Sequence, residues 1–128
     1  MAELKKQVKI KILTSTVIKS PWANGYCRKY FLELNYNNKK FSFPYTDSVM
    51  AYCNGDKLDK MNALYCVLLD ADAYDNSRDI DDFSAEFGYE KISECLKAYR
   101  ACEKTSEKMH EIFTNAELEQ LHDEFQDY

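Results

Sequence analysis

The chain has 128 residues, of which 45% are hydrophobic, and it contains only three glycines and two prolines. This composition allows one folded domain with a buried core and excludes a linker, a low-complexity tail and a disordered protein. The net charge is −5, but residues 1–46 carry a balance of +7 and residues 47–128 a balance of −12. Because an electrostatic field depends on where the charges lie, the two parts can attract partners of opposite charge.

The sequence carries no signal for a membrane or for an oxidising compartment. No apolar run approaches the roughly 18 residues that cross a bilayer, and the N-terminus lacks the apolar stretch of a secretory signal. The five cysteines form no Cys-x-x-Cys pair, which is typical of reduced thiols in the cytosol. We therefore expect a soluble, cytoplasmic protein with no membrane partner.

The first third of the chain has the alternating pattern of β-strands. Apolar and basic residues alternate over residues 8–12, as in a half-buried strand, and β-branched residues up to Ile18 can prolong it. Residues 26–36 predict a second strand and residues 39–45 a third. The two asparagines at 37–38 tolerate the positive φ of a two-residue hairpin loop.

The pairing that this loop imposes is consistent with a half-buried sheet. It places three apolar pairs on one face, namely Leu34 with Phe41, Leu32 with Phe43 and Tyr30 with Tyr45. A shift of one residue would turn one of the two apolar sets to the other face, so the pattern predicts this register. Pro44 indicates that the third strand is an edge strand or ends there.

From residue 45 the apolar period changes to that of helices. The sequence predicts a short helix over 47–52, a longer one over about 58–74, a third over 80–87, a long one over 89–113 and a closing helix after residue 114. We expect an α+β fold in which an N-terminal three-stranded antiparallel sheet packs against four or five C-terminal helices. Residues 1–128 then form a single domain, with a basic β meander over 1–46 and an acidic helical part over 47–128.

Three of the helix ends have recognisable caps. Asp79 or Ser77 can cap the third helix, which Gly88 ends. The segment 114–117, Thr-Asn-Ala-Glu, has the spacing of a capping box. Phe113 and Leu118 on either side of it are spaced as a hydrophobic staple, so this junction is predicted to be structural.

The residue patterns do not indicate catalysis. His110 and His122 lack the spacing of a metal site, and neither a Gly-x-Ser-x-Gly turn nor a glycine-rich phosphate loop is present. The acidic run over 70–82 fails the calcium-loop pattern, because its sixth position is Asp75 and its twelfth is Asp81. We therefore expect no catalytic residue, no metal and no cofactor.

The basic part predicts a charged outer sheet face. Lys5, Lys9 and Lys11 share one parity in the first strand, opposite to the apolar set. The residues expected to contact nucleic acid on this face are Lys9, Lys11, Lys29, Phe31 and Lys40. A basic sheet with an exposed aromatic ring can hold single strands by stacking a base, although lysines on a sheet also prevent aggregation.

The acidic part predicts a second surface. Its carboxylates gather in one run before and within the third helix and in another at the C-terminus. The residues expected to contact a partner are Asp70, Asp72, Asp75, Asp79, Asp81, Asp82, Glu117, Glu119, Asp123 and Glu124. Such carboxylates can compete with nucleic acid for a cationic channel, and a solvated helix face explains the same residues.

Several motifs rich in aromatic residues occur from the second strand onward. The motifs are Tyr30-Phe31, Phe41-Ser42-Phe43-Pro44-Tyr45, Tyr74-Asp75, Asp82-Phe83-Ser84-Ala85-Glu86-Phe87-Gly88-Tyr89, Lys97-Ala98-Tyr99 and Ile112-Phe113-Thr114. They resemble a pattern in uncharacterised proteins of phages and mobile elements of gut bacteria, over most of the chain from the second strand onward. The resemblance implies an accessory protein and transfers no catalytic residue.

By analogy with small acidic phage proteins that block host defence, we expect a non-enzymatic inhibitor in the host cytoplasm. Its partner would be a basic host protein or nucleoprotein such as a Cas nuclease, bound through the acidic surface. The alternative function is that of a nucleic-acid-binding accessory protein that uses the basic sheet face. An enzyme, the third class, would need a pocket of clustered polar residues.

Overall fold

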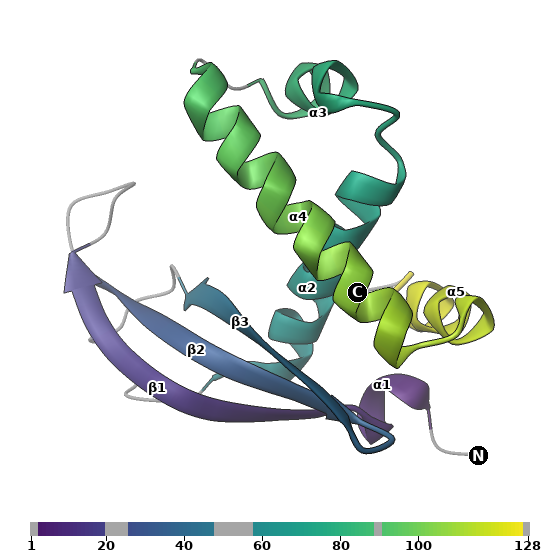
Figure 1. The fold of residues 1–128 in the computed structure, drawn as a ribbon. Helices are drawn as coiled ribbons and strands as arrows, with labels where there is room; N and C mark the ends of the chain where they lie inside the picture. Colours follow the sequence, from purple (N-terminus) through teal and green to yellow (C-terminus); the bar gives the residue numbers. More distant parts are fainter. Residues whose placement is uncertain (1–2, 20–25, 48–57, 89–90, 127–128) are drawn as a thin grey trace. The chain divides into compact units, whose positions relative to one another are not determined.

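The computed structural model describes residues 3–19, 26–47, 58–88 and 91–126 (Figure 1). An N-terminal three-stranded antiparallel sheet is followed by helices, which confirms the α+β class. The contacts within the chain form two compact units, Met1–Ala63 and Leu64–Tyr128. We call them the sheet unit and the helical unit. None of the helices in the described ranges is long and apolar enough to cross a membrane.

The sheet has the order β1-β2-β3, with strands β1 (Lys9–Lys19), β2 (Tyr26–Tyr36) and β3 (Lys39–Asp47). Asn37 and Asn38 form the tight loop between β2 and β3 and have φ values of 53° and 63°. The predicted register is confirmed, because β2 and β3 make the following pairs: Tyr36–Lys39, Leu34–Phe41, Leu32–Phe43 and Tyr30–Tyr45. Pro44 lies within β3, which is an edge strand of the sheet among the described residues; of the two alternatives predicted for Pro44, the edge strand is the one found.

A bulge at Leu13 changes the facing of β1. Ile12 pairs with Leu32, but Thr14 already pairs with Phe31. One extra residue therefore reverses the alternation beyond this point. The predicted extension of the first strand is confirmed. Beyond the bulge, however, each residue lies on the face opposite to the one that an uninterrupted alternation would give it.

A short helix that the sequence did not predict precedes the sheet. Helix α1 (Leu4–Gln7) buries Leu4, which is 4% exposed. Lys5 is in this helix and forms an ion pair with Glu3 at 3.3 Å. The expectation that Lys5 belongs to the first strand is therefore wrong, because a helical turn anchored by Leu4 occupies this segment.

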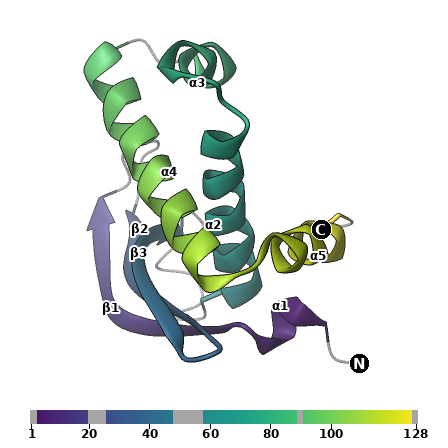
Figure 2. The same cartoon turned by 45° about the vertical axis from the view of Figure 1, so that its right-hand side comes forward.

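The helices are α2 (Lys60–Asp75), α3 (Ile80–Phe87), α4 (Ile92–Ile112) and α5 (Asn115–Glu124). Figures 1 and 2 show α4 alongside α2, with α3 near one end of this pair and α5 near the other. The predicted short helix over 47–52 and the predicted turn over 20–25 lie outside the described residues. The four predicted helices that remain are confirmed, with bounds that differ by a few residues.

The predicted caps of α3 and α5 are present. The side chain of Asp79 accepts a hydrogen bond from the Asp82 amide at 2.9 Å, and Gly88 ends α3 with a φ of 63°. Thr114 Oγ1 accepts from the Glu117 amide at 3.1 Å, and Glu117 Oε1 accepts from the Thr114 amide at 2.9 Å. Both ends of the capping box are therefore made.

The core of the helical unit combines aliphatic residues with tilted aromatic pairs. Its buried residues include Leu64, Val67, Leu68, Phe83, Cys95, Met109, Phe113, Leu118 and Leu121. The ring of Phe83 meets that of Tyr99 edge-on at 5.3 Å. Ile92, predicted to continue the apolar stripe of α4, is instead 86% exposed. Helical side chains point toward the N-terminus, so at the first residue of α4 this side chain extends beyond the helix.

Removal of the α5 cap tests this junction. We expect Thr114→Ala to lower the free energy of unfolding by about 0.5–2 kcal/mol, because the amide of Glu117 loses its partner. Leu118→Ala should cost more, about 2–5 kcal/mol, because the side chain is buried. Urea denaturation measures both effects. Thr105→Ala, which removes a hydroxyl from the middle of α4, is the control. An equal loss in the control would show that the cap has no special role.

Candidate functional site

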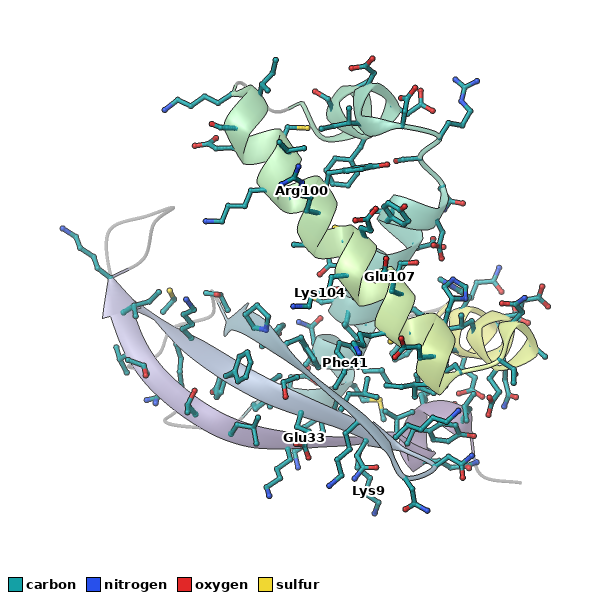
Figure 3. The ribbon with its side chains drawn as sticks, in the orientation of Figure 1. Lys9, Glu33, Phe41, Arg100, Lys104 and Glu107 are labelled. Carbon is teal, nitrogen blue, oxygen red and sulfur yellow. The ribbon has the colours of Figure 1, made fainter. Side chains whose placement is uncertain are left out.

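The pairing of the strands places the basic residues of the sheet on one face. We call it the outer face, opposite to the face that carries Tyr30, Leu32 and Leu34. Four cross-strand rows form it, namely Lys9–Asn35–Lys40, Lys11–Glu33–Ser42, Thr14–Phe31–Pro44 and Thr16–Lys29–Thr46. Figure 3 shows Lys9 and Glu33 on the opposite side of the sheet from Phe41. All five residues predicted to bind nucleic acid therefore share this face.

Phe31 occupies the middle of the outer face. It lies on the central strand between Thr14 and Pro44, and its side chain is 42% exposed. A half-exposed aromatic ring on a sheet offers a flat apolar surface against which another ring can stack. Lys29 lies two residues away on the same strand and the same face. The positive charge of Lys29 would therefore lie next to a molecule bound over the ring of Phe31.

The four lysines of this face are exposed. None of Lys9, Lys11, Lys29 and Lys40 forms an ion pair with another residue in the described ranges. Among the residues of the four cross-strand rows, only Glu33 is acidic. The face therefore has a net positive charge that is available to an anionic partner.

A shallow hollow lies at one end of the sheet unit. It has a volume of about 410 Å³, and its polar lining residues are Lys9, Lys11, Glu33, Asn35 and Lys60. Lys60 is the first residue of α2 and was not predicted to belong to this surface. No local pattern reveals it, because its position depends on where α2 begins relative to the sheet. Tyr45 helps to define that position, since its hydroxyl oxygen accepts a hydrogen bond from the side-chain Nδ2 of Asn62 at 2.6 Å.

Many of the predicted acidic contact residues have partners within the fold. Asp79 and Glu117 cap helices. Asp82 accepts hydrogen bonds from Arg78, with a distance of 2.8 Å from Nε, and these bonds hold the pKa of its carboxyl below the usual value. Glu124 accepts from the Gln120 side chain at 2.8 Å. Carboxylates that cap a helix or accept hydrogen bonds from a neighbouring side chain in this way stabilise helices and turns in proteins generally.

Two further aspartates on α2 contact the two histidines. Asp75 lies 2.9 Å from Nε2 of His110 on α4, and Asp72 lies 3.6 Å from Nε2 of His122 on α5. The hydroxyl of Ser106 donates to Asp75 at 2.5 Å. These contacts connect α2 to α4 and α5 of the helical unit.

The cluster of Ser106, Asp75 and His110 has the residue types of a hydrolytic triad but not its connections. The serine donates to the carboxylate of Asp75 rather than to the imidazole, so the histidine that acts as the general base in such a triad does not contact its hydroxyl. Ser106 is also only 3% exposed. Within the described part of the chain, no group of three or more His, Cys, Asp or Glu side chains could hold a metal ion. The arrangement is that of a structural link.

The remaining predicted acidic residues are Asp70, Asp81, Glu119 and Asp123, and all are exposed. No described side chain forms an ion pair with any of them. The acidic surface that remains available to a partner is therefore smaller than the sequence predicted, because six of its ten residues already have partners inside the fold. Its role in binding stays a prediction.

Asp70 has an unusual environment for an unpaired carboxylate. It lines a depression of about 820 Å³ in the helical unit, together with apolar groups that include Leu69 and Phe83. The residue as a whole is exposed, but neighbouring protein atoms displace water from its carboxyl. This burial raises the pKa of Asp70 to about 6. Burial and, second, the charge of Asp70 raise the pKa of the Cys102 thiol to about 11, so this thiol is protonated at neutral pH and is a poor nucleophile.

The raised pKa of Asp70 predicts a pH-dependent stability. The folded protein holds this proton more tightly than the unfolded chain does, so folding stability falls as the pH rises from about 4 to 6. Asp70→Asn should remove that loss and raise the free energy of unfolding at pH 7 by about 1 kcal/mol or less, because solvent still screens the carboxylate. Urea denaturation at pH 4 and pH 7 measures the difference. Asp81→Asn is the control; if both variants shift stability equally at the two pH values, the explanation from Asp70 fails.

Comparisons with protein-family models, curated proteins and solved structures find no match to this chain. The resemblance to phage proteins therefore stays a prediction based on the aromatic motifs.

Proposed function

We propose that the protein is a non-enzymatic binding protein whose outer sheet face binds single-stranded nucleic acid. The observation that supports this most directly is the common face of four lysines without described ion partners around the exposed ring of Phe31. The combination supplies both interactions that single strands need. Lysines attract the phosphates, and an aromatic ring stacks on a base.

The geometry is suited to an extended strand. Residues two apart on a β-strand lie about 6.6 Å apart along its direction, so Lys29 and Phe31 are separated by about the length of one nucleotide in an extended chain. A base stacked on Phe31 would leave the neighbouring phosphate within reach of a lysine. The hollow that Lys9, Lys11 and Lys60 line offers a further place for a phosphate.

Protection against aggregation explains only part of this surface. Lysines on edge strands discourage pairing between sheets, and Lys9, Lys11 and Lys40 lie on β1 and β3. Lys29 and Phe31 lie on the central strand, where no edge needs protection. An exposed aromatic ring would favour sheet association rather than prevent it. A bound base accounts for both residues.

Fluorescence anisotropy with labelled 20-nucleotide DNA and RNA tests the proposal. Phe31→Ala should weaken binding about 5- to 150-fold, which corresponds to the loss of one stacked base at about 1–3 kcal/mol. Lys11→Glu combined with Lys29→Glu should weaken it further. If four lysines contact phosphates, the affinity should fall about 50-fold between 50 and 200 mM salt, from a slope of about −0.7 per contact.

The matched control replaces two exposed lysines of α4, Lys97→Glu with Lys104→Glu, which changes the net charge equally. We expect this variant to retain most of the affinity. Equal weakening by both double variants would indicate a general charge effect, and the absence of saturable binding to either DNA or RNA would refute the proposal. Circular dichroism confirms that each variant is folded.

The second candidate function is inhibition of a host defence system through the acidic surface. It is favoured by the exposed carboxylates of Asp81, Glu119 and Asp123, which have no described ion partner. In this proposal a phage or mobile-element protein binds a basic host protein or nucleoprotein, such as a Cas nuclease, in the cytoplasm. The partner's cationic channel would contact these carboxylates.

A DNA-cleavage assay with a purified Cas nuclease and its guide RNA tests this second function. We expect the protein to reduce cleavage and the triple variant Asp81→Lys, Glu119→Lys, Asp123→Lys to lose at least tenfold in potency. The control is Lys11→Glu with Lys29→Glu, which alters the sheet face and should inhibit as the native chain does. Lack of inhibition, or inhibition by the triple variant at native potency, would contradict the acidic-surface function for the nuclease tested.

A further inference from the structure

A depression of the helical unit combines carboxylates with apolar side chains in its lining. Its volume of about 820 Å³ lies in the range of small-molecule sites, about 300–1,000 Å³. The residues that line it come from α2, α3, α4 and the segment between α2 and α3. They include Leu69, Asp70, Asp72, Asp82, Phe83 and Ala85.

The three carboxylates of this depression are not equivalent. Asp82 is bound by Arg78 at 2.8 Å, and Asp72 lies 3.6 Å from Nε2 of His122. Asp70 forms no ion pair with any residue in the described ranges. A ligand would therefore find one carboxylate without an ion pair. It is flanked by Asp82, whose charge Arg78 compensates, and by Asp72, which lies beside the imidazole of His122.

The apolar wall of the depression adds a second requirement on the ligand. Leu69 is 43% exposed and presents an aliphatic side chain to the depression. Ala73 and Ala85 leave room beside it, and Phe83 forms part of the lining. Together these groups can cover a short aliphatic chain, which would remove apolar surface from water.

The chemistry of the lining excludes several ligand classes. Three carboxylates repel an anion. A metal ion needs several converging ligands, and no such group is found among the described side chains. An uncharged apolar molecule would leave Asp70 ionised and without a counterion in a partly dehydrated place. An organic cation satisfies both the carboxylate and the apolar wall.

We propose that the depression between α2, α3 and α4 binds a primary ammonium group on an aliphatic stem, with the ammonium on Asp70 and the stem against Leu69 and Ala85. The ammonium can come from a free diamine or polyamine, or from a lysine side chain of another protein. The raised pKa of Asp70 supports this arrangement, because a cation beside the carboxylate restores the stabilisation that burial removes. The site lies within the helical unit and does not depend on nucleic-acid binding by the sheet.

Titration of the ¹⁵N-labelled full chain with cadaverine, followed by NMR chemical shifts at pH 7.5, tests the site. We expect saturable shifts at residues of the depression and at least tenfold weaker binding by Asp70→Asn. Asp81→Asn is the matched control, because Asp81 is an exposed aspartate on α3 that does not line the depression. Ala85→Trp should fill the space and abolish binding while leaving the carboxylate in place.

Two arms identify the ligand source and the role of the stem. Nα-acetyl-lysine methylamide represents a lysine side chain of a protein. If cadaverine binds more tightly than this compound, the site is assigned to a free amine. If cadaverine binds more weakly, the site is assigned to a protein lysine. Pentanol and potassium chloride supply the stem and the charge separately and should each bind at least tenfold more weakly than cadaverine. The proposal would be overturned if Asp70→Asn bound cadaverine as tightly as the native chain, or if Asp81→Asn weakened binding as much as Asp70→Asn. Chemical shift changes confined to residues outside the depression would also overturn it. Single-strand binding by Asp70→Asn should remain at the native level, which separates this outcome from failure of the sheet function.

Discussion

The structure of the sheet unit depends on the pairing that begins at Asn37 and Asn38. Both residues accept the positive φ that a two-residue loop requires, and this loop length determines which residues of β2 and β3 face each other. Since side chains alternate along a strand, one choice of register sends Leu32 and Leu34 to the buried face and Phe31 to the outer face. The charged face and the apolar face are therefore two results of a single constraint.

The bulge at Leu13 limits how far this constraint extends into β1. Before the bulge, Lys9 and Lys11 join the outer face, and after it Thr14 and Thr16 do so. Two neutral residues thus take places on the same face as Phe31 and Lys29. The positive charge of β1 is concentrated at one end of the outer face, near the hollow, rather than along the whole strand.

Acidic residues in the helical unit illustrate why a count of charges overstates a binding surface. Asp79 and Glu117 satisfy free backbone amides at helix starts, and Asp72 and Asp75 contact the histidines of other helices. These roles use the charge locally, where it stabilises the fold. Asp70 differs because the surrounding protein makes its ionised form less favourable. A carboxylate held in this way is more typical of a binding site than of a solvated surface.

The sequence by itself determined the features that depend on near neighbours: the hairpin register, the caps at Asp79 and Thr114, and the four described helices beyond the sheet. Local backbone preferences and side-chain periodicity decide such features, and both can be recognised over a few residues. Only the tertiary structure decided the bulge at Leu13, the position of Lys60 beside the outer face, and the depression around Asp70. These depend on contacts between residues distant in the chain, and no local pattern records which of several similar aspartates will lack a partner.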